Sequence, residues 1–377
     1  MKKLFIIVNV DWFFLSHRKE IALAAQRAGW DVTIVTADTG KLKDISSLGL
    51  KVINLPMSRS GMNIFQELGT LNFLRKLYKH ERPDVVHHVG MKTILWGTLA
   101  AKFSHVKGVV NAVSGLGGFF AEDNKSILAK VMPKVLRFSH KGMNLLVIFQ
   151  NHEDEAMYMK KGIIRNNQAR FIKGSGVNLK EFSYTPEPIE GKTNVILTAR
   201  MIVEKGVFLL TEAAEKLRQD YKNKVDFWLV GGLDDHPGAI TKEQLDVVCD
   251  GNYIKWLGYR TDVRELLQQS HIVAFPSYYM EGLPKSLIEA CAVGRPIITT
   301  QSIGCKDTVD DCVNGFLIPT KDVDALASKL RVLIDNPEIR VSMGKASRTK
   351  AEKEFSLDVV IERHLKIYNE LIQASNG

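Results

Sequence analysis

The chain has 377 residues, a length typical of two domains of ordinary size. Hydrophobic residues make up 45% and charged residues 25%, a globular composition that excludes a disordered chain. The net charge of +9 is uneven, because residues 1–182 carry 27 Lys and Arg against 14 Asp and Glu, whereas the rest carry 24 against 28.

The charge map indicates partners for the first half of the chain. A basic half suits phosphates or an anionic membrane surface, and the absence of a recognised nucleic-acid-binding motif predicts no nucleic-acid partner. The four cysteines lack C-x-x-C spacing and are interpreted as reduced thiols. The apolar run after Lys3 is too short for a signal peptide, and no run approaches the roughly 20 apolar residues of a membrane span. We therefore expect a cytoplasmic protein, peripheral on the inner face of the membrane.

Apolar runs alternate with amphipathic stretches in the first half, the order expected of a parallel α/β domain. The pattern predicts strands at residues 3–10, 31–36, 51–55, 85–88, 108–113, 145–149 and 169–172. It predicts helices at residues 16–29, 62–80, 93–104, 125–141 and 153–161. Residues 174–192 contain Gly, Ser and Pro with little periodicity, which indicates a linker.

The same alternation restarts after the linker. It predicts strands at residues 194–198, 226–231, 253–257, 272–276, 296–300 and 315–318, and helices at 208–221, 242–249, 263–269, 284–293, 322–335, 338–354 and 357–374. Two such series predict two doubly wound, parallel-sheet, Rossmann-like domains facing a central cleft. We expect a first domain at 1–175, a linker at 176–192, a second domain at 193–355, and a C-terminal helix at 356–377 that packs back toward the first domain.

Two carboxylates, Glu281 and Glu289, lie eight residues apart at the opening of a predicted helix, directly after the buried strand 272–276. Ligands of parallel sheets bind outside the carboxyl ends of the strands. Eight helical residues rise roughly 12 Å, about the reach of a nucleotide-sugar's diphosphate. The alternative is that both glutamates lie on a solvent-facing side of the helix. Apolar neighbours such as Leu287 and Ile288 disfavour it, because an unpaired charge in such a segment is costly.

Two cations, Arg200 and Lys205, follow the predicted strand 194–198. A guanidinium offers a planar fork and an ammonium a point charge, and both suit the oxygens of a departing nucleoside diphosphate. An ordinary surface loop is the alternative, which the downstream glutamate pair disfavours. The helix start near Gly282 would add unpaired backbone N–H groups.

With these motifs, the carboxy-terminal half resembles a family 4 glycosyltransferase of the two-domain GT-B fold. The segments that carry the resemblance are 199–206, 229–232, 281–289, 294–300 and 314–319. The resemblance implies a retaining, metal-independent hexosyltransferase that uses a nucleotide-sugar as donor and needs no cofactor. It implies catalytic roles for Arg200, Lys205 and Glu281, and donor binding by Glu289, Gly282, Leu283, Pro284, Tyr259 and Arg260.

The amino-terminal half is similar to a narrower bacterial subgroup. Segments 9–18, 87–92 and 113–118 resemble enzymes that extend polyprenyl-diphosphate-linked sugars, such as the lipid-linked bacillosamine α-1,3-N-acetylgalactosaminyltransferases. The resemblance implies a UDP-sugar donor and a polyprenyl-diphosphate-linked saccharide acceptor in surface-polysaccharide or glycan assembly. Candidates to line the acceptor side of the cleft are Asp11, His17, Arg18, His87, His88, Lys92, Ser114, Gly115 and Gly117.

The subgroup pattern has departures and open alternatives. The loop at Asp11 lacks the family's glycine pair, and Ser114 stands where many members have a histidine. His87 and His88 could instead be satisfied strand-end histidines, and His17 with Arg18 could be a polar helix start. Tyr259 could equally be packing.

Two further patterns have more than one interpretation. Asp322 and Asp324 match a D-x-D metal pattern by letter, but the following helix favours N-capping, so we expect no metal site. The basic amphipathic segment 125–141 could contact lipid, or its apolar stripe could pack on the sheet.

Three functions fit the fold. The first is the retaining glycosyltransferase acting on a lipid-linked saccharide. The second is a UDP-sugar 2-epimerase or a soluble-acceptor glycosyl synthase of the same fold. The third is a non-catalytic scaffold that binds a sugar-nucleotide.

Overall fold

The structure, a computed structural model, describes residues 1–57, 64–116, 127–279 and 281–375. The chain divides into two compact units, one of Met1–Ser175 with Asp358–Gly377 and one of Gly176–Leu357. The segment 176–192, expected as a linker, therefore belongs to the second unit, and nearly all of the C-terminal helix belongs to the first.

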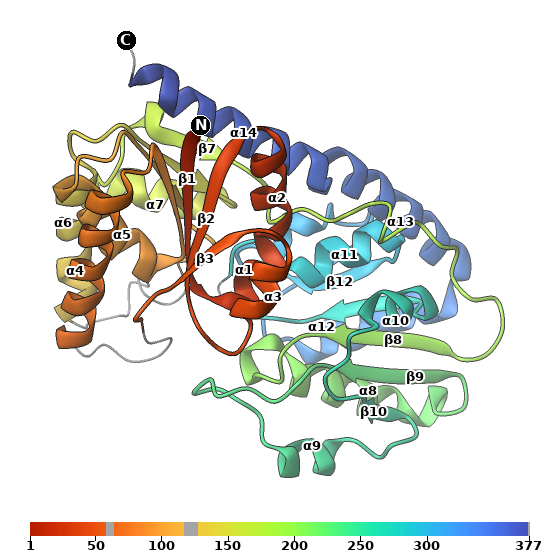
Figure 1. The fold of residues 1–377 in the computed structure, drawn as a ribbon. Coiled ribbons are helices and arrows are strands. Elements are labelled where there is room, and N and C mark those ends of the chain that lie inside the picture. The colour runs from red at the N-terminus through yellow and green to blue at the C-terminus, as the bar shows by residue number, and fades with distance from the viewer. Residues whose placement is uncertain (58–63, 117–126, 280, 376–377) are drawn as a thin grey trace. The chain divides into compact units, whose positions relative to one another are not determined.

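Seven parallel strands form the sheet of the first unit, in the order β3-β2-β1-β4-β5-β6-β7 (Figure 1). Their bounds are β1 Lys2–Val10, β2 Trp30–Ala37, β3 Lys51–Asn54, β4 Val85–Val89, β5 Gly108–Ala112, β6 Leu145–Phe149 and β7 Ala169–Phe171. The strand order reverses between β1 and β4, the kind of switch point at which doubly wound sheets bind ligands.

Helices cover both faces of this sheet (Figure 1). One face packs against α4 Ile64–Glu81, α5 Met91–Phe103, α6 Ile127–His140 and α7 His152–Lys160. The other packs against α1 Asp11–His17, α2 Lys19–Arg27, α3 Leu42–Ser47 and the C-terminal α14 Leu357–Ala374. Each face thus has its own apolar core, and α14 completes the second one.

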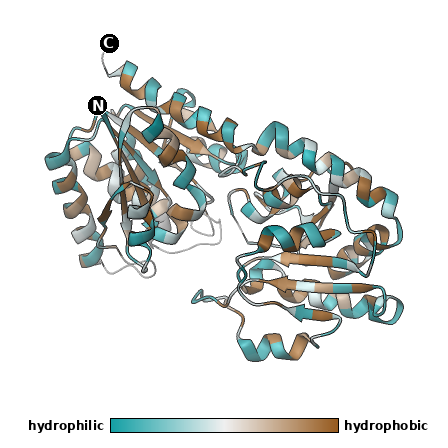
Figure 2. Ribbon diagram, turned by 45° about the vertical axis from the view of Figure 1, so that its right-hand side comes forward, coloured by the Kyte–Doolittle hydropathy of each residue, from teal (hydrophilic) through white to brown (hydrophobic). Residues whose placement is uncertain are grey.

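Six parallel strands form the sheet of the second unit, in the order β10-β9-β8-β11-β12-β13. Their bounds are β8 Thr193–Thr198, β9 Val225–Val230, β10 Ile254–Trp256, β11 Ile272–Phe275, β12 Ile297–Thr300 and β13 Gly315–Ile318. The helices are α8 Val207–Tyr221, α9 Lys242–Val248, α10 Val263–Gln269, α11 Lys285–Val293, α12 Val323–Asp335 and α13 Pro337–Lys350. Hydrophobic colour runs along the strands of both units (Figure 2), as expected of sheets buried on both faces.

All thirteen predicted strands are present, with ends shifted by no more than one residue. The GT-B expectation of two Rossmann-like sheets is confirmed. The helix predicted at 16–29 is wrong in its start, because α1 begins directly at Asp11 and the helical path breaks at Arg18, whose φ is −129°. The short α3 was not predicted. The helix predicted at 338–354 ends at Lys350 and continues as a π-helix, Ala351–Phe355.

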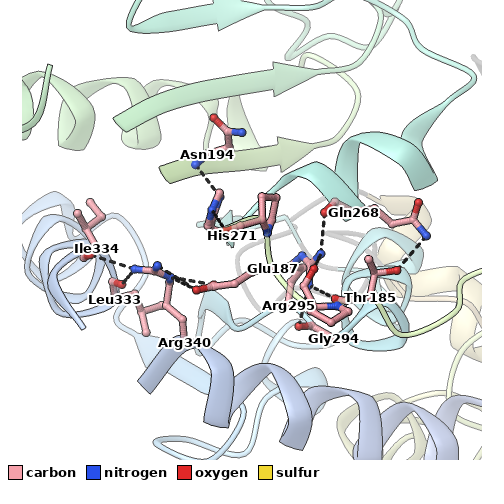
Figure 3. A network of polar contacts seen from close by, with 12 residues as sticks. Thr185, Glu187, Asn194, Gln268, His271, Gly294, Arg295, Leu333, Ile334 and Arg340 are labelled. Carbon is pink, nitrogen blue, oxygen red and sulfur yellow. Dashed lines mark hydrogen bonds and ion pairs between the residues drawn. The ribbon is translucent and has the colours of Figure 1, made fainter. Parts of the chain in front are cut away.

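Two buried arginines explain why the expected linker is held on the second unit (Figure 3). Arg295 donates from Nη1 to the carbonyl of Thr185 at 2.7 Å and from Nη2 to the carbonyl of Gln268 at 2.8 Å. Arg340 pairs with Glu187 through two contacts of 2.9 and 3.0 Å. We call residues 182–192 the strap, because these bonds fasten the segment along the second unit.

Within the described ranges, no helix combines the length and apolar character needed to cross a membrane.

Candidate functional site

The best-defined site lies in the second unit, where the loops after β8 and β11 meet. Lys205 ends a short 3-10 turn, Val203–Lys205, that leads into α8. Glu281 lies in the loop between β11 and α11. A backbone hydrogen bond joins the two loops, because the carbonyl of Glu204 accepts the N–H of Tyr278 at 2.9 Å. The chain order strand, loop, helix therefore brings residues 76 positions apart to one edge of the sheet.

Lys205 and Glu281 form a close ion pair. The Lys205 Nζ lies 2.7 Å from each of the two Glu281 carboxylate oxygens. Their side chains are only 9% and 18% exposed, so the pair is shielded from water on most sides. The ammonium also lies 5.0 Å from the ring centre of Tyr279 and 5.4 Å from that of Phe275. An anionic ligand entering here would compete with Glu281 for the same cation.

The loop that carries Glu281 is pressed against Gly304. A Cβ at Gly304 would lie 1.6 Å from the carbonyl oxygen of Gly282, and its φ is +83°, so only glycine fits. The helix after this loop begins at Lys285, with Pro284 as its N-cap. Gly282, Leu283 and Pro284, the predicted donor-binding residues, are buried in this turn. Glu281 itself is outside the helix, so the spacing of roughly 12 Å expected for eight helical residues does not apply.

Glu289 lies in the second turn of α11 and is partly buried. Burial raises the pKa of Glu289, and the Lys285 ammonium, 3.5 Å away, opposes that rise. The carboxylate is therefore desolvated and held by a neighbour on its own helix. Such a group is available to accept bonds from ligand hydroxyls.

Arg200 follows β8 and pairs with Asp234 in the loop after β9. The Arg200 Nη1 donates to Asp234 at 3.0 Å. The two loops approach closely, since a Cβ at Gly231 would lie 1.6 Å from the carbonyl oxygen of Ala199. Arg200 is thus placed on the same loop as Lys205 but in a different ion pair.

Tyr259 and Arg260, predicted to flank the base, lie just beyond β10. Tyr259 is exposed and next to Gly232. Arg260 is bound to Asp262 by two hydrogen bonds, one of them 2.7 Å long from Nε. Both residues follow the carboxyl end of β10, as Arg200 follows the carboxyl end of β8 in the same sheet. Their role in base binding stays a prediction.

Four of the predicted acceptor-side residues of the first unit are buried, namely Asp11, Arg18, His87 and His88. Each has contacts inside the first unit that account for its burial. Their role in acceptor binding stays a prediction.

Asp11, the first residue of α1, holds the loop after β2 at the carboxyl edge of the sheet. Its carboxylate accepts the Thr39 hydroxyl and the backbone N–H groups of Thr39 at 2.7 Å, Lys41 at 2.9 Å and Trp12 at 2.7 Å. Burial alone would raise the pKa of Asp11, but these hydrogen bonds, that of the Thr39 hydroxyl foremost, outweigh it and lower the pKa. Arg18 lies under α14, where burial lowers its pKa to about 10.

His87 and His88 belong to hydrogen-bond networks inside the first unit. His87 bonds through Nδ1 to the Tyr368 hydroxyl of α14 at 2.8 Å. His88 bonds to Asn111 at 2.9 Å and to the Tyr78 hydroxyl at 3.0 Å. Burial lowers the pKa of both imidazoles, that of His88 to about 4, so both are neutral at pH 7. His88 is therefore a satisfied core histidine, the alternative left open by the sequence. His87 is a core histidine too, but its Nε2 is buried without a hydrogen-bond partner among the described residues.

The remaining candidates of the first unit are partly exposed. His17 stacks on Phe13 at 4.2 Å, and Lys92 pairs with Glu67 at 2.8 Å. Ser114 and Gly115 lie in the loop after β5 and are half-buried. Gly117 lies outside the described residues. These four described positions stay predicted acceptor contacts.

Asp322 is an N-cap, as predicted, because its carboxylate accepts the N–H of Ala325 at 2.8 Å. Among the described residues, no group of three or more His, Cys, Asp or Glu side chains could hold a metal ion.

Asp234, Tyr279 and Gly304 were not predicted from the sequence. Each takes part in the site only through contacts between distant loops: Asp234 with Arg200, the Tyr279 ring with Lys205, and Gly304 with Gly282. A signal for Asp234 existed, since two acidic residues, Asp234 and Asp235, closely follow the Gly-Gly pair after β9.

Both halves of the chain match models of known protein families. The family model described as "Glycosyl transferases group 1" matches residues 180–350, and "Glycosyl transferase 4-like" matches residues 3–151. Each model thus covers most of one unit.

Several curated relatives match along nearly the whole chain, and the names of two of them include diphospho-undecaprenol sugars. The first is the N,N'-diacetylbacillosaminyl-diphospho-undecaprenol alpha-1,3-N-acetylgalactosaminyltransferase of Campylobacter jejuni, 31% identical over 96% of this chain and 98% of the relative. The second is the UDP-Gal:alpha-D-GlcNAc-diphosphoundecaprenol alpha-1,3-galactosyltransferase of Escherichia coli, 24% identical over 91% and 90% of the two chains.

The fold has solved counterparts. Anabaena HepE, crystallised in complex with UDP, is similar with a TM-score of 0.78 at 17% identity, over 98% of this chain and 100% of that one. At this identity, the likeness shows the fold alone.

Proposed function

This chain belongs to the family 4 glycosyltransferases of the GT-B fold, and we propose that it moves a hexose or N-acetylhexosamine from a UDP-sugar to a polyprenyl-diphosphate-linked saccharide. The product would enter bacterial surface-polysaccharide or glycan assembly. The relatives from Campylobacter jejuni and Escherichia coli support the acceptor class, since the names of both include diphospho-undecaprenol sugars. The Escherichia coli relative, whose name gives UDP-Gal, supports the donor class.

One observation carries the catalytic part of the proposal: the shielded ion pair of Lys205 and Glu281, at the start of α11. A buried ammonium whose counter-ion is a carboxylate is a site that an incoming diphosphate can occupy. The donor's phosphates would replace the carboxylate on Lys205. Glu281 would then be free to accept hydrogen bonds from the sugar.

The proposed chemistry uses charge and position. As the bond from the anomeric carbon to the β-phosphate oxygen breaks, negative charge grows on the phosphate, and Lys205 and Arg200 would stabilise it. The acceptor hydroxyl would attack from the same face, with its proton passing to the leaving phosphate, so that the configuration is retained. Glu289 would hold the ribose hydroxyls. We propose no metal and no cofactor.

We also propose that α6 contacts the anionic surface of the membrane. Its buried side includes Met132 and Leu136. Its exposed side combines apolar and basic residues, which are Val131, Lys134, Arg137, Phe138 and Lys141 just past its end. Apolar side chains among cations suit an interface with anionic lipid. The enzyme would then act as a peripheral protein at the inner face of the membrane.

The function is tested by incubating the protein with a panel of UDP-sugars and a polyprenyl-diphosphate saccharide, and weighing the products by mass spectrometry. We expect a saccharide one sugar heavier, and no product from Lys205→Ala. An epimerised UDP-sugar would support an epimerase instead. A product formed equally well on a free disaccharide would support a soluble-acceptor synthase.

The membrane contact is tested by co-sedimentation with vesicles of phosphatidylglycerol or phosphatidylcholine. We expect binding to the anionic vesicles only, weakened by salt. The double variant Lys134→Glu with Phe138→Ser should lose binding, whereas Lys222→Glu at the end of α8, an exposed lysine of the second unit, should not. Equal binding of both variants would refute the contact.

A further inference from the structure

The loop of residues 231–240, which follows β9 and which we call the backing loop, lies along the loop that carries Arg200. Met201 donates its backbone N–H to the carbonyl of Gly232 at 3.0 Å, and Ile240 donates to the carbonyl of Met201 at 2.9 Å. Ile202 forms an antiparallel bridge with Ala239. The backing loop is thus fixed against the cation-bearing loop along its length.

Within this loop, Asp234 is a fixed anion. Its side chain is 9% exposed, and one carboxylate oxygen accepts the backbone N–H of His236 at 2.9 Å. The other oxygen accepts Nη1 of Arg200, whose side chain is 39% exposed. A guanidinium carries five N–H donors in a planar fork. A contact through one nitrogen orients that plane and leaves other donors for a ligand.

The backing loop also lies behind Lys205. Gly238 donates its N–H to Nδ1 of His236 at 3.0 Å, so the imidazole accepts at that nitrogen. The same ring meets Tyr279 edge to face at 5.8 Å, and the Tyr279 ring faces the Lys205 ammonium. Both proposed phosphate-binding cations are therefore supported by this loop, Arg200 directly and Lys205 through an aromatic ring.

We propose that Asp234 is a positioning residue for sugar transfer: it holds the Arg200 guanidinium in the orientation that meets the donor diphosphate. The inference rests on the proposed function and adds a residue to it. An ion pair between two exposed side chains would do little to orient either of them. Here Asp234 is buried and anchored by the His236 N–H, so the more exposed Arg200 is the partner that becomes oriented.

The chain offers a matched control. Arg331 donates from Nη1 to Asp220 at 3.0 Å, the same atoms and distance as in the pair of Arg200 and Asp234. The difference is exposure, because the side chains of Arg331 and Asp220 are 47% and 53% exposed. Asp220→Asn should therefore leave donor use unchanged.

The experiment is a double-mutant cycle on kcat/KM for the UDP-sugar, with Asp234→Asn, Arg200→Ala and the double variant. Misplacing a phosphate-binding group costs roughly 10- to 100-fold, and we expect Asp234→Asn to lose that much. We expect no further loss when Asp234→Asn is added to Arg200→Ala, and partial recovery in Asp234→Glu.

Three results would overturn the inference. They are a wild-type rate in Asp234→Asn, an equal fold-loss in the Arg200→Ala background, and a fall in Tm that accounts for the lost rate. If the wild-type protein transfers no sugar from any UDP-sugar, the proposed function itself fails. If it transfers sugar and the cycle is additive, only the role of Asp234 fails.

Discussion

Replacing Glu281 with Gln should tighten the binding of UDP while slowing sugar transfer. The carboxylate is the close counter-ion of Lys205, at 2.7 Å from both oxygens, and Gln keeps its shape while removing its charge. In the wild-type protein, a diphosphate must displace this carboxylate. In the variant, the ammonium lacks its counter-ion until UDP supplies one.

The magnitude follows from the geometry. A hydrogen bond to a charged group contributes about 1.5–3 kcal/mol. Because the side chains of Lys205 and Glu281 are mostly but not fully buried, we use this range and not the larger energies of fully buried ion pairs. Since about 1.4 kcal/mol corresponds to a tenfold change in Kd, UDP should bind roughly 10- to 100-fold more tightly. Transfer should slow, because the neutral amide of the variant would bind the sugar without placing a negative charge near the anomeric carbon.

Isothermal titration with UDP measures the first effect, and the transfer assay measures the second. Glu215→Gln, which removes one partner of an exposed ion pair with Arg218, is the control and should bind UDP as the wild type does. Weaker or unchanged UDP binding by Glu281→Gln would refute the idea that Glu281 occupies the diphosphate position on Lys205.

Three other predictions concern stability and loop geometry. Glu187→Ala leaves Arg340 buried without its carboxylate and should lower the free energy of unfolding, measured with guanidinium chloride, by about 3–5 kcal/mol. Asp246→Ala, which removes one partner of an exposed ion pair with Lys242, should lower it by less than about 1 kcal/mol. Equal losses in the two variants would contradict the role of Arg340 and Glu187 in fastening the strap. Burial lowers the pKa of His364 to about 3, so only the unfolded chain takes up that proton near pH 6.5. The contribution of the neutral imidazole to the free energy of unfolding should therefore be complete above about pH 6.5 and be lost progressively as the pH drops toward about 4. A urea concentration at the unfolding midpoint that does not change over this range would contradict this prediction. Gly304→Ala should displace the Glu281 loop and lower kcat at least about tenfold; an unchanged kcat would show that the contact is dispensable.

The strands were predictable because buried parallel strands are continuous apolar runs, which the sequence displays without reference to other parts of the chain. Arg200, Lys205 and Glu281 stand out in the sequence because their motifs are local, and the structure joins Lys205 with Glu281. Their catalytic roles stay a prediction. Helix α1 was missed because its apolar residues follow β1 without a break, so no change of period marks its start.

Features that depend on contacts between distant segments could not be predicted. The strap reads as a linker because it has no periodicity, yet Arg295 and Arg340, more than a hundred residues away, fasten it. His87 and His88 read as polar strand ends, although they form hydrogen bonds with Tyr368 and Asn111 inside the fold. Neither partner can be inferred from its neighbours in the sequence.

A crystal structure of the protein with UDP would test the central claim most directly. We predict that a β-phosphate oxygen lies within about 3.2 Å of the Lys205 Nζ, that Arg200 contacts the same diphosphate, and that the Glu281 carboxylate has left the ammonium. A diphosphate bound away from both cations, with the pair of Lys205 and Glu281 intact, would contradict the account.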